Sequence, residues 1–313
     1  TGPGERGAMR RCEDCHDASR AHGWLPRRER HFAVLACESC HIDRAWAPAR
    51  QETDYTLPAA PDGVSVTYRG YAEEPGAGKG RLVGYAPALL PRRELDGKTR
   101  WYPYNLMTTW LWVGGVDGRE VPVPRALLER ALFDNGHLRP EVLAALDHDH
   151  DGRLSDEERR LVSATDQAVV AGRLQAVGVA APRIVGEISA HGLHHGVAQA
   201  DLATRDCSTC HSDGSRFAQV VLLSRRAPEG VLPHFLADGP GAAEGQVERR
   251  DDGALVYRPQ TAKMGLYLFG HSRWPWLDLL GAAAFLGSLL GVSVHGGLRF
   301  LAARRRRPTE ARS

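Results

Sequence analysis

One five-residue pattern contains every cysteine of this chain. The two thiols of a Cys-x-x-Cys-His pattern bond covalently to a c-type haem, and the adjacent histidine becomes the proximal ligand of its iron. A redox dithiol, half of a zinc site or a pair of disulfides would leave the repeated trailing histidine unexplained. The pattern therefore predicts three covalently bound molecules of heme c. Its three copies are Cys12-Glu-Asp-Cys15-His16, Cys37-Glu-Ser-Cys40-His41 and Cys207-Ser-Thr-Cys210-His211.

The attachment chemistry also constrains the compartment. Haem is attached covalently on the outer side of energy-transducing membranes, so we expect an exported chain whose haem-bearing part lies in the periplasm. No signal peptide is visible, and the sequence begins Thr1-Gly2-Pro3 without methionine, which is typical of a processed or truncated chain. If more of the protein preceded Thr1, further haems could have been removed with it. The net charge of +2 favours no polyanionic partner, so no nucleic acid is expected.

Near the C-terminus, residues 279–298 contain no Asp, Glu, Lys or Arg. Twenty such residues are long enough to cross a bilayer as a helix, although a buried core helix is the alternative. Trp274 and Trp276 precede the run as interfacial aromatics, and Arg304 to Arg307 follow it. The positive-inside rule then predicts a single-pass anchor over 274–303 in a bacterial inner membrane, with a basic cytoplasmic tail over 304–313.

The membrane segment also suggests a membrane partner. His295 is an ionisable group at membrane depth, which is typical of a site or a partner contact, although its side chain can also snorkel to the nearby surface. Several glycines in the segment suit close packing against another membrane helix.

The remaining pattern predicts an α+β fold with low regular content. We expect a dihaem cytochrome c segment over 1–50, a small β-rich segment over 51–124, a helical segment over 125–182 and a third haem segment over 183–273. Strands are predicted at 64–68, 81–85 and 109–113. Asp117-Gly118 predicts a hairpin turn, and Pro122 with Pro124 makes the returning strand an edge. Within the helical segment a second helical pattern starts at Ser155.

A calcium loop is predicted inside the helical segment. Residues 147–158 read Asp-His-Asp-His-Asp-Gly-Arg-Leu-Ser-Asp-Glu-Glu, which fits the loop of an EF-hand with Gly152 at the sharp turn. An acidic, solvated turn is the alternative. Because one such loop is present, we expect a structural Ca²⁺ rather than a switch. The predicted ligands are Asp147, Asp149, Asp151, Arg153 through its carbonyl, Ser155 and Glu158.

The function of each haem depends on the sixth position of its iron. A second strong ligand favours electron transfer, whereas an open position allows substrate chemistry. The favoured distal candidates are His31, His191 and His195, with His22 and His194 as substitutes. Methionine is the other option, and Met9, Met107 and Met264 are the candidates; His234 and His271 are left unassigned. Histidines outnumber methionines near the motifs, so we expect bis-His haems of low potential.

The stretch from about 184 to 300 resembles a known family. The third motif follows His191-Gly-Leu-His194-His195-Gly196-Val, and the anchor ends Val294-His295-Gly-Gly-Leu-Arg299. This arrangement resembles the membrane-anchored multihaem cytochromes c related to octahaem tetrathionate reductase, some of which are coupled to a cytochrome b subunit. This chain has three motifs rather than eight, and it has no Cys-x-x-Cys-Lys that would mark a Lys-ligated catalytic haem. The resemblance implies a periplasmic haem chain fed by a quinol-oxidising membrane partner.

Three functions are compatible with these features. The leading hypothesis is electron transfer between a membrane cytochrome b, or the quinone pool, and a periplasmic redox partner such as a further multihaem cytochrome. The alternative is a reductase of a small oxyanion such as tetrathionate, nitrite or sulfite, with one haem five-coordinate. The third is a calcium-stabilised assembly scaffold. Whether the chain is itself an enzyme stays open, and an electron-transfer subunit of an oxidoreductase complex is favoured.

Overall fold

A computed structural model describes residues 11–59, 63–72, 80–199, 202–237, 244–272 and 275–305. Its centre is a seven-stranded mixed sheet with the order β10-β8-β4-β1-β2, in which β3 and β5 also pair with β4. The mixed α+β class is confirmed. The sheet is larger than the expected β-rich segment because β8 and β10 join it from later in the chain. Its strands are β1 (Ala49–Ala59), β2 (Gly63–Arg69), β3 (Ala88–Arg93), β4 (Thr99–Val116), β5 (Arg119–Pro122), β8 (Ala180–Gly192) and β10 (His234–Phe235).

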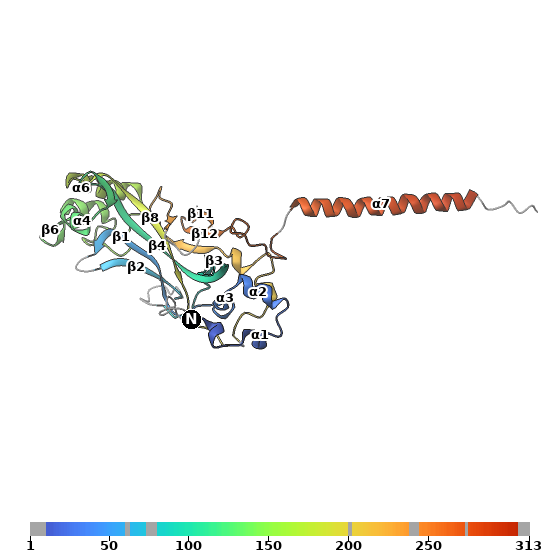
Figure 1. The fold of residues 1–313 in the computed structure, drawn as a ribbon. Coiled ribbons are helices and arrows are strands. Elements are labelled where there is room, and N and C mark those ends of the chain that lie inside the picture. Colours follow the sequence, from blue (N-terminus) through green and yellow to red (C-terminus); the bar gives the residue numbers. More distant parts are fainter. Residues whose placement is uncertain are drawn as a thin grey trace, which may run out of the picture.

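Strand β4 organises this sheet. Its sequence is rich in aromatic and β-branched residues, which favour strands, and from Met107 to Val113 half-buried and fully buried positions alternate. It pairs antiparallel with β8 from Tyr104 opposite Gly192 to Gly115 opposite Ala180, and parallel with β1. The strand therefore runs through the whole sheet (Figure 1).

The predicted hairpin turn is confirmed. Asp117 and Gly118 both have positive φ angles, +50° and +78°, as a two-residue hairpin loop of the primed type requires. Within the described residues β5 pairs with β4 alone, which leaves it at an edge. The strand predicted at 81–85 is wrong: Leu82 and Tyr85 make isolated bridges, and Gly84 between them has a φ of +67°, which interrupts an extended strand.

Three helices pack at one end of the sheet. They bury an apolar face of each helix, and Leu132, Val142 and Leu174 are fully buried in the same core as Trp110 of β4. The helix predicted from Ser155 onward starts later than expected: residues 156–159 form turns, and the helix starts after Ser163, whose side chain accepts a hydrogen bond from the Asp166 amide. The elements here are α4 (Arg125–Leu132), β6 (Phe133–Asp134), β7 (His137–Leu138), α5 (Pro140–Leu146) and α6 (Ala164–Ala176).

A second sheet covers the core from another side. It has the order β11-β12-β9, with β9 at Val221–Ser224, β11 at Gly245–Arg249 and β12 at Leu255–Pro259. Leu223, Leu255 and Tyr257 from this sheet are fully buried and belong to the main core.

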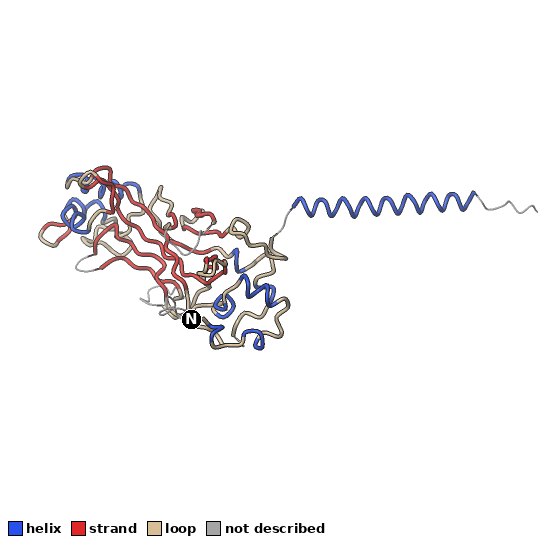
Figure 2. Tube along the Cα trace, in the orientation of Figure 1, coloured by secondary structure: helices blue, strands red, loops and turns tan. Residues whose placement is uncertain are grey.

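The short helical elements that hold or flank the cysteine motifs gather at the opposite end of the main sheet from α4 and α6 (Figures 1 and 2). They are η1 (Cys12–Asp14), α1 (Ala18–Ala21), α2 (Arg28–Val34), α3 (Cys37–His41), η2 (Cys207–Thr209) and η3 (Arg216–Ala218). Motifs from the two ends of the sequence therefore share one region of the fold.

The long apolar C-terminal helix is confirmed as α7 (Pro275–Arg305). From Trp276 to Arg305 it is long and apolar enough to cross a membrane, and its most apolar stretch is fully exposed. In Figure 1 it extends away from the rest of the chain. Trp274, Arg306 and Arg307, which enter the prediction of its orientation, lie outside the described residues.

Candidate haem-binding site

Each cysteine motif folds as a single helical turn. The His16 amide donates to the Cys12 carbonyl at 2.9 Å, and the His211 amide donates to the Cys207 carbonyl at the same distance. The middle motif is helix α3 itself. In such a turn residues i, i+3 and i+4 lie on one face, which explains why the attachment chemistry needs two cysteines and a histidine at this spacing.

All six cysteines are free of disulfides. Burial raises the pKa of the Cys37 thiol to about 12 and that of the Cys210 thiol to about 11. Both thiols are therefore protonated at neutral pH in this fold.

The three motifs are in contact, with the middle motif between the other two. The side chains of Cys12 and Cys37 hydrogen bond to each other, and Cys40 lies near enough to Cys210 to interact electrostatically. Backbone bonds also join the second motif to the approach of the third, because the Thr204 amide donates to the Cys40 carbonyl at 2.9 Å. Groups bound at the three motifs would therefore form one cluster.

Two pairs of histidine rings lie close together in this cluster, each in an edge-to-face arrangement. The ring centroids of His22 and His41 are 5.9 Å apart, and those of His31 and His211 are 6.1 Å apart. Two imidazole nitrogens that each bind one metal ion at about 2 Å from opposite sides place their ring centroids about 6 Å apart. Both pairs therefore combine a motif histidine with a distal candidate at the spacing that two axial ligands need.

The same four histidines are oriented alike by hydrogen bonds. Each has its Nδ1 atom against a backbone carbonyl, which leaves Nε2 free to bind a metal, an arrangement typical of ligating histidines. The partners are Ala18 O for His22 (2.8 Å), Arg27 O for His31 (3.3 Å), Ala198 O for His41 (3.1 Å) and Phe269 O for His211 (2.8 Å).

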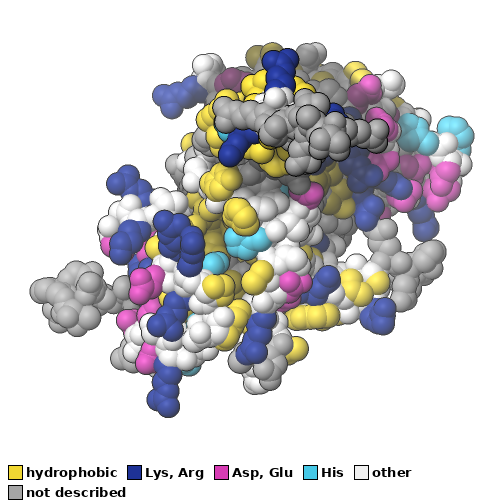
Figure 3. Space-filling view, turned by 90° about the vertical axis from the view of Figure 1, so that its right-hand side faces the viewer, with side chains coloured by type: hydrophobic (Ala, Val, Ile, Leu, Met, Phe, Trp, Pro, Cys, Tyr) yellow, Lys and Arg dark blue, Asp and Glu magenta, His cyan; other side chains and the backbone are white. Residues whose placement is uncertain are grey.

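Local backbone geometry supports the contact between His211 and the Phe269 carbonyl. Gly270, which follows Phe269, has a φ of +88°, and a Cβ atom there would lie 2.5 Å from the His211 carbonyl oxygen. Glycine is therefore required where the segment before α7 approaches the third motif. The same face, turned to the viewer in Figure 3, shows histidine side chains beside apolar side chains near its centre.

The other histidine candidates lie elsewhere. His191, at the end of β8, is exposed and its Nε2 atom is 3.0 Å from the Ser189 hydroxyl. His194 has its Nδ1 atom 3.2 Å from Glu38 of the second motif, and His195 next to it is exposed. His16 is exposed, and in the described part of the chain no second histidine ring contacts it.

The methionines and unassigned histidines have other surroundings. Met107 lies in β4, with its sulfur 4.0 Å from the Thr53 hydroxyl, and Met264 packs against the small apolar cluster that Cys210 also contacts. His271 has its Nδ1 atom 3.1 Å from the Ser212 carbonyl, and His234 is exposed in β10. Met9 lies outside the described residues.

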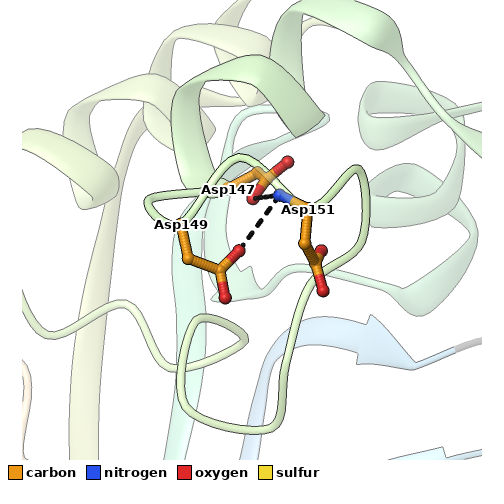
Figure 4. A group of neighbouring side chains, drawn as sticks. All are labelled: Asp147, Asp149 and Asp151. Carbon is orange, nitrogen blue, oxygen red and sulfur yellow. Dashed lines mark hydrogen bonds between the residues drawn. The ribbon is translucent and has the colours of Figure 1, made fainter.

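The predicted calcium loop brings three of its carboxylates together. Oxygens of Asp147, Asp149 and Asp151 lie within 4.8 Å of one another, and Figure 4 shows the three side chains on one loop after α5. The Asp151 amide donates to both Asp147 and Asp149, at 3.2 Å each, which holds the carboxylates in this arrangement. Gly152 has a φ of +81°, as expected at the sharp turn.

The other predicted calcium ligands lie outside this group. Glu158 accepts hydrogen bonds from the amide and hydroxyl of Ser155, at 2.9 and 2.7 Å, and from the His148 amide at 2.7 Å. These donors, the Ser155 amide first, lower the pKa of Glu158 to about 2. The carboxylate of Glu158 therefore closes the loop, and ligation by Glu158, by Ser155 and by the Arg153 carbonyl stays a prediction.

One residue of the motif region was missed by the sequence reasoning. Arg216 is buried and donates to the Ser39 and Ile42 carbonyls, which lie on either side of Cys40 and His41. An arginine in a polar stretch carries no distinctive signal, so the sequence could not have identified it.

Comparison with known proteins adds little. No protein-family profile matches the chain, and no curated protein sequence matches it. Among solved structures, the chain is similar to an octaheme cytochrome c from Shewanella oneidensis, with 14% sequence identity and a TM-score of 0.35 over 66% of this chain. The match covers 49% of that protein, so the chain spans about half of its length. At this level the likeness carries no argument, and the function is argued from the residues.

Proposed function

We propose that this chain is a membrane-anchored c-type cytochrome that relays electrons through three haems in the periplasm. The observation that carries the proposal is the pairing of His22 with His41 and of His31 with His211, at centroid distances of 5.9 and 6.1 Å. All four rings are oriented by backbone carbonyls, as ligating histidines are. When bound, each haem supplies an iron that takes up and releases one electron.

The residues of this chain have separate tasks in the proposal. Cys12, Cys15, Cys37, Cys40, Cys207 and Cys210 would hold the haems covalently, and His16, His41 and His211 would be the proximal ligands. His22 and His31 would be the second ligands of two irons, which would exclude substrate from them. No side chain needs to donate or accept a proton, because electron transfer makes and breaks no covalent bonds.

His194 is the distal candidate for the first motif. Its partner Glu38 also acts electrostatically on Cys12, which places His194 near the junction of the first two motifs. His195 is its neighbour in the chain and the alternative ligand.

The surroundings of His16 are also compatible with the second candidate function, an oxyanion reductase. No other described histidine ring contacts His16, so the first haem is the candidate for an open sixth position. An oxyanion reductase would use that position for tetrathionate, nitrite or sulfite.

The ligand pairing predicts the spin states of the haems. In the purified full-length chain, His22→Ala and His31→Ala should each convert about one third of the haem from low spin to high spin, as measured by electron paramagnetic resonance. His191→Ala is the matched control, because His191 bonds to Ser189 and faces no motif histidine. Unchanged low-spin spectra in both variants would refute the pairing.

The wild-type spectrum separates the two functions. Electron transfer expects only low-spin haem in the oxidised protein. A high-spin signal that added nitrite or sulfite displaces would favour the reductase instead.

Helix α7 is the proposed anchor. It carries Arg304 and Arg305 at its C-terminal end, which favours a cytoplasmic C-terminus, and a cytochrome b or quinone-oxidising subunit is the proposed electron donor in the membrane. A green fluorescent protein fused to the C-terminus should fluoresce in cells that express the full chain, because it folds when it remains in the cytoplasm. A dark fusion that is present in the membrane fraction would argue for the opposite orientation.

A further inference from the structure

Arg216 holds a buried positive charge at the centre of the motif region. It is 7% exposed, at the start of η3, and its guanidinium donates to the Ser39 carbonyl at 2.7 Å and to the Ile42 carbonyl at 2.5 Å. These carbonyls belong to the C-terminal turn of α3, where a cation is favoured by the helix dipole. The guanidinium therefore fixes the backbone on both sides of Cys40 and His41.

Within the described residues no carboxylate forms an ion pair with this charge, and the buried Nε atom of Arg216 has no hydrogen-bond partner. Asp43 is the acidic residue that acts on it, from an exposed position. Arginine stays protonated in proteins, so a positive charge persists in surroundings where charges are poorly screened.

The charge acts on two of the three attachment sites. Arg216 interacts electrostatically with the thiols of Cys40 and Cys210, which belong to the second and third motifs. The charges that act on Cys12 of the first motif are acidic, from Glu38 and Glu13, and the same two carboxylates act on Cys37 of the second motif. Arg216 therefore acts on the second and third motifs, and the carboxylates act on the first and second.

We propose that Arg216 raises the reduction potentials of the haems attached at the second and third motifs and thereby sets them apart from the first. This inference rests on the proposed function. Reduction lowers the charge of a haem iron by one, so a nearby cation stabilises the reduced state relative to the oxidised state. Arg216 is a positioning residue as well, because it holds the helix that carries His41.

A redox titration of the purified full-length protein tests the charge. Arg216→Gln removes the charge and keeps an N–H donor, and it should lower the midpoints of two haems by about 59 mV, equivalent to a tenfold change in the one-electron equilibrium. The haem at the first motif should keep its midpoint. Arg216→Lys should restore the wild-type midpoints, because it restores the charge.

The chain offers a matched control in Arg69. Its guanidinium also donates to backbone carbonyls, those of Leu106 and Leu222, and its Nε atom is also buried without a partner. Its charge acts on Tyr85 and on no cysteine. Arg69→Gln should therefore leave all three midpoints unchanged.

A second variant tests the proposal without disturbing the buried arginine. Asp43→Asn removes an exposed negative charge that offsets Arg216, so it should raise the same two midpoints. The proposal is overturned if Arg216→Gln leaves the midpoints unchanged, if Arg216→Lys lowers them equally, or if Asp43→Asn lowers them or has no effect. Should Arg216→Gln fail to fold, the Asp43→Asn and Arg216→Lys results decide.

Measurements of haem content and spin state distinguish a failure of this inference from a failure of the proposed function. A pyridine haemochrome count below three haems per chain, or a wild-type spectrum without low-spin haem, would refute the proposed function. Three low-spin haems whose midpoints do not respond to residue 216 would refute only the role of Arg216.

Discussion

The two ends of the main sheet are stabilised in different ways. The sheet body, meaning β1–β5, β8 and α4–α6, buries Leu106, Trp110, Leu132 and Leu174 almost completely. The motif lobe, meaning residues 11–45, 194–199 and 202–216, contains η1, α1 and α2, none of which has a buried residue, and its buried apolar residues among those described are Ala36 and Ile42. The sheet body therefore has an extensive core of its own side chains, whereas the motif lobe buries few apolar side chains and depends more on hydrogen bonds and on whatever its cysteines bind.

The largest expected effect comes from removing the attachment sites. In a variant with all six cysteines replaced by alanine, amides of the motif lobe should exchange hydrogen at least about a hundredfold faster than in the haem-loaded protein. Amides of β4 and β8 should keep their protection, because their core contains no haem. Hydrogen exchange followed by mass spectrometry makes the comparison. Equal protection of the motif lobe in both proteins would show that it folds without haem.

A matched pair of leucines tests where the core lies. Leu106 in β4 is fully buried, and Leu106→Ala should lower the free energy of unfolding by about 2–5 kcal/mol. Leu202 in the motif lobe is 72% exposed, and Leu202→Ala should change it by less than about 0.5 kcal/mol. Urea unfolding followed by circular dichroism measures both. Similar losses for the two variants would contradict the division into a sheet body and a motif lobe.

The free energy of unfolding is expected to depend on pH through Asp54, which lies in the sheet body. Burial raises the pKa of Asp54 to about 6, although Thr56 donates to it through its amide and hydroxyl. The folded state thus binds a proton that the unfolded state releases between about pH 4 and pH 6, so stability falls as the pH rises through this window. Asp54→Asn should remove this fall and raise the free energy of unfolding at pH 7 by about 3 kcal/mol.

Denaturant unfolding of wild type and Asp54→Asn between pH 4 and pH 8 provides the measurement. Glu52 is the control position, because it is buried on the same strand but paired with Arg160 at 3.1 Å. Glu52→Gln should destabilise the protein at neutral pH, since it leaves the arginine without its partner. Parallel stability curves for wild type and Asp54→Asn would exclude a proton on Asp54.

The same division explains what the sequence could predict of the fold. The hairpin at Asp117-Gly118 and the long apolar α7 were predictable because their signals are local. The extent of the sheet was not predictable, because β8 pairs with β4 across about 80 residues and the pattern of one strand does not show which strand it pairs with. The helix predicted from Ser155 starts only at Ala164, because Glu158 accepts hydrogen bonds from the Ser155 and His148 amides and holds a turn before it.

At the site, the sequence predicted the residues of the attachment motifs but not which histidines lie close to one another. The cysteines and proximal histidines follow one contiguous pattern, so three motifs were found without any structure. The histidine pairs depend on the folding of separate segments, and the structure favours His22, which the sequence ranked below His191 and His195. Their assignment as ligands stays a prediction. Arg216 acts on Cys40 and Cys210 through tertiary contacts, which no local pattern contains.

The smallest expected effect concerns calcium, which should stabilise the sheet body only. The loop of Asp147, Asp149 and Asp151 follows α5, at the end of the sheet away from the motif lobe (Figures 1 and 4). At a calcium concentration about ten times the Kd, binding should raise the free energy of unfolding by about 1.4 kcal/mol. Glu158→Gln should weaken that gain, because its carboxylate closes the loop and is a predicted ligand.

Differential scanning calorimetry with calcium and with a chelator measures the gain. Asp156→Asn is the matched control, because Asp156 lies in the same loop but outside the ligand pattern. The haem spectrum should be unaffected in both variants, since this loop lies at the opposite end of the sheet from the cysteine motifs. If calcium does not change the melting temperature of the wild type, the three carboxylates form a solvated turn and not a calcium site. A calcium-dependent haem spectrum would instead couple the two ends of the sheet, and the independence of the sheet body from the motif lobe would then be lost.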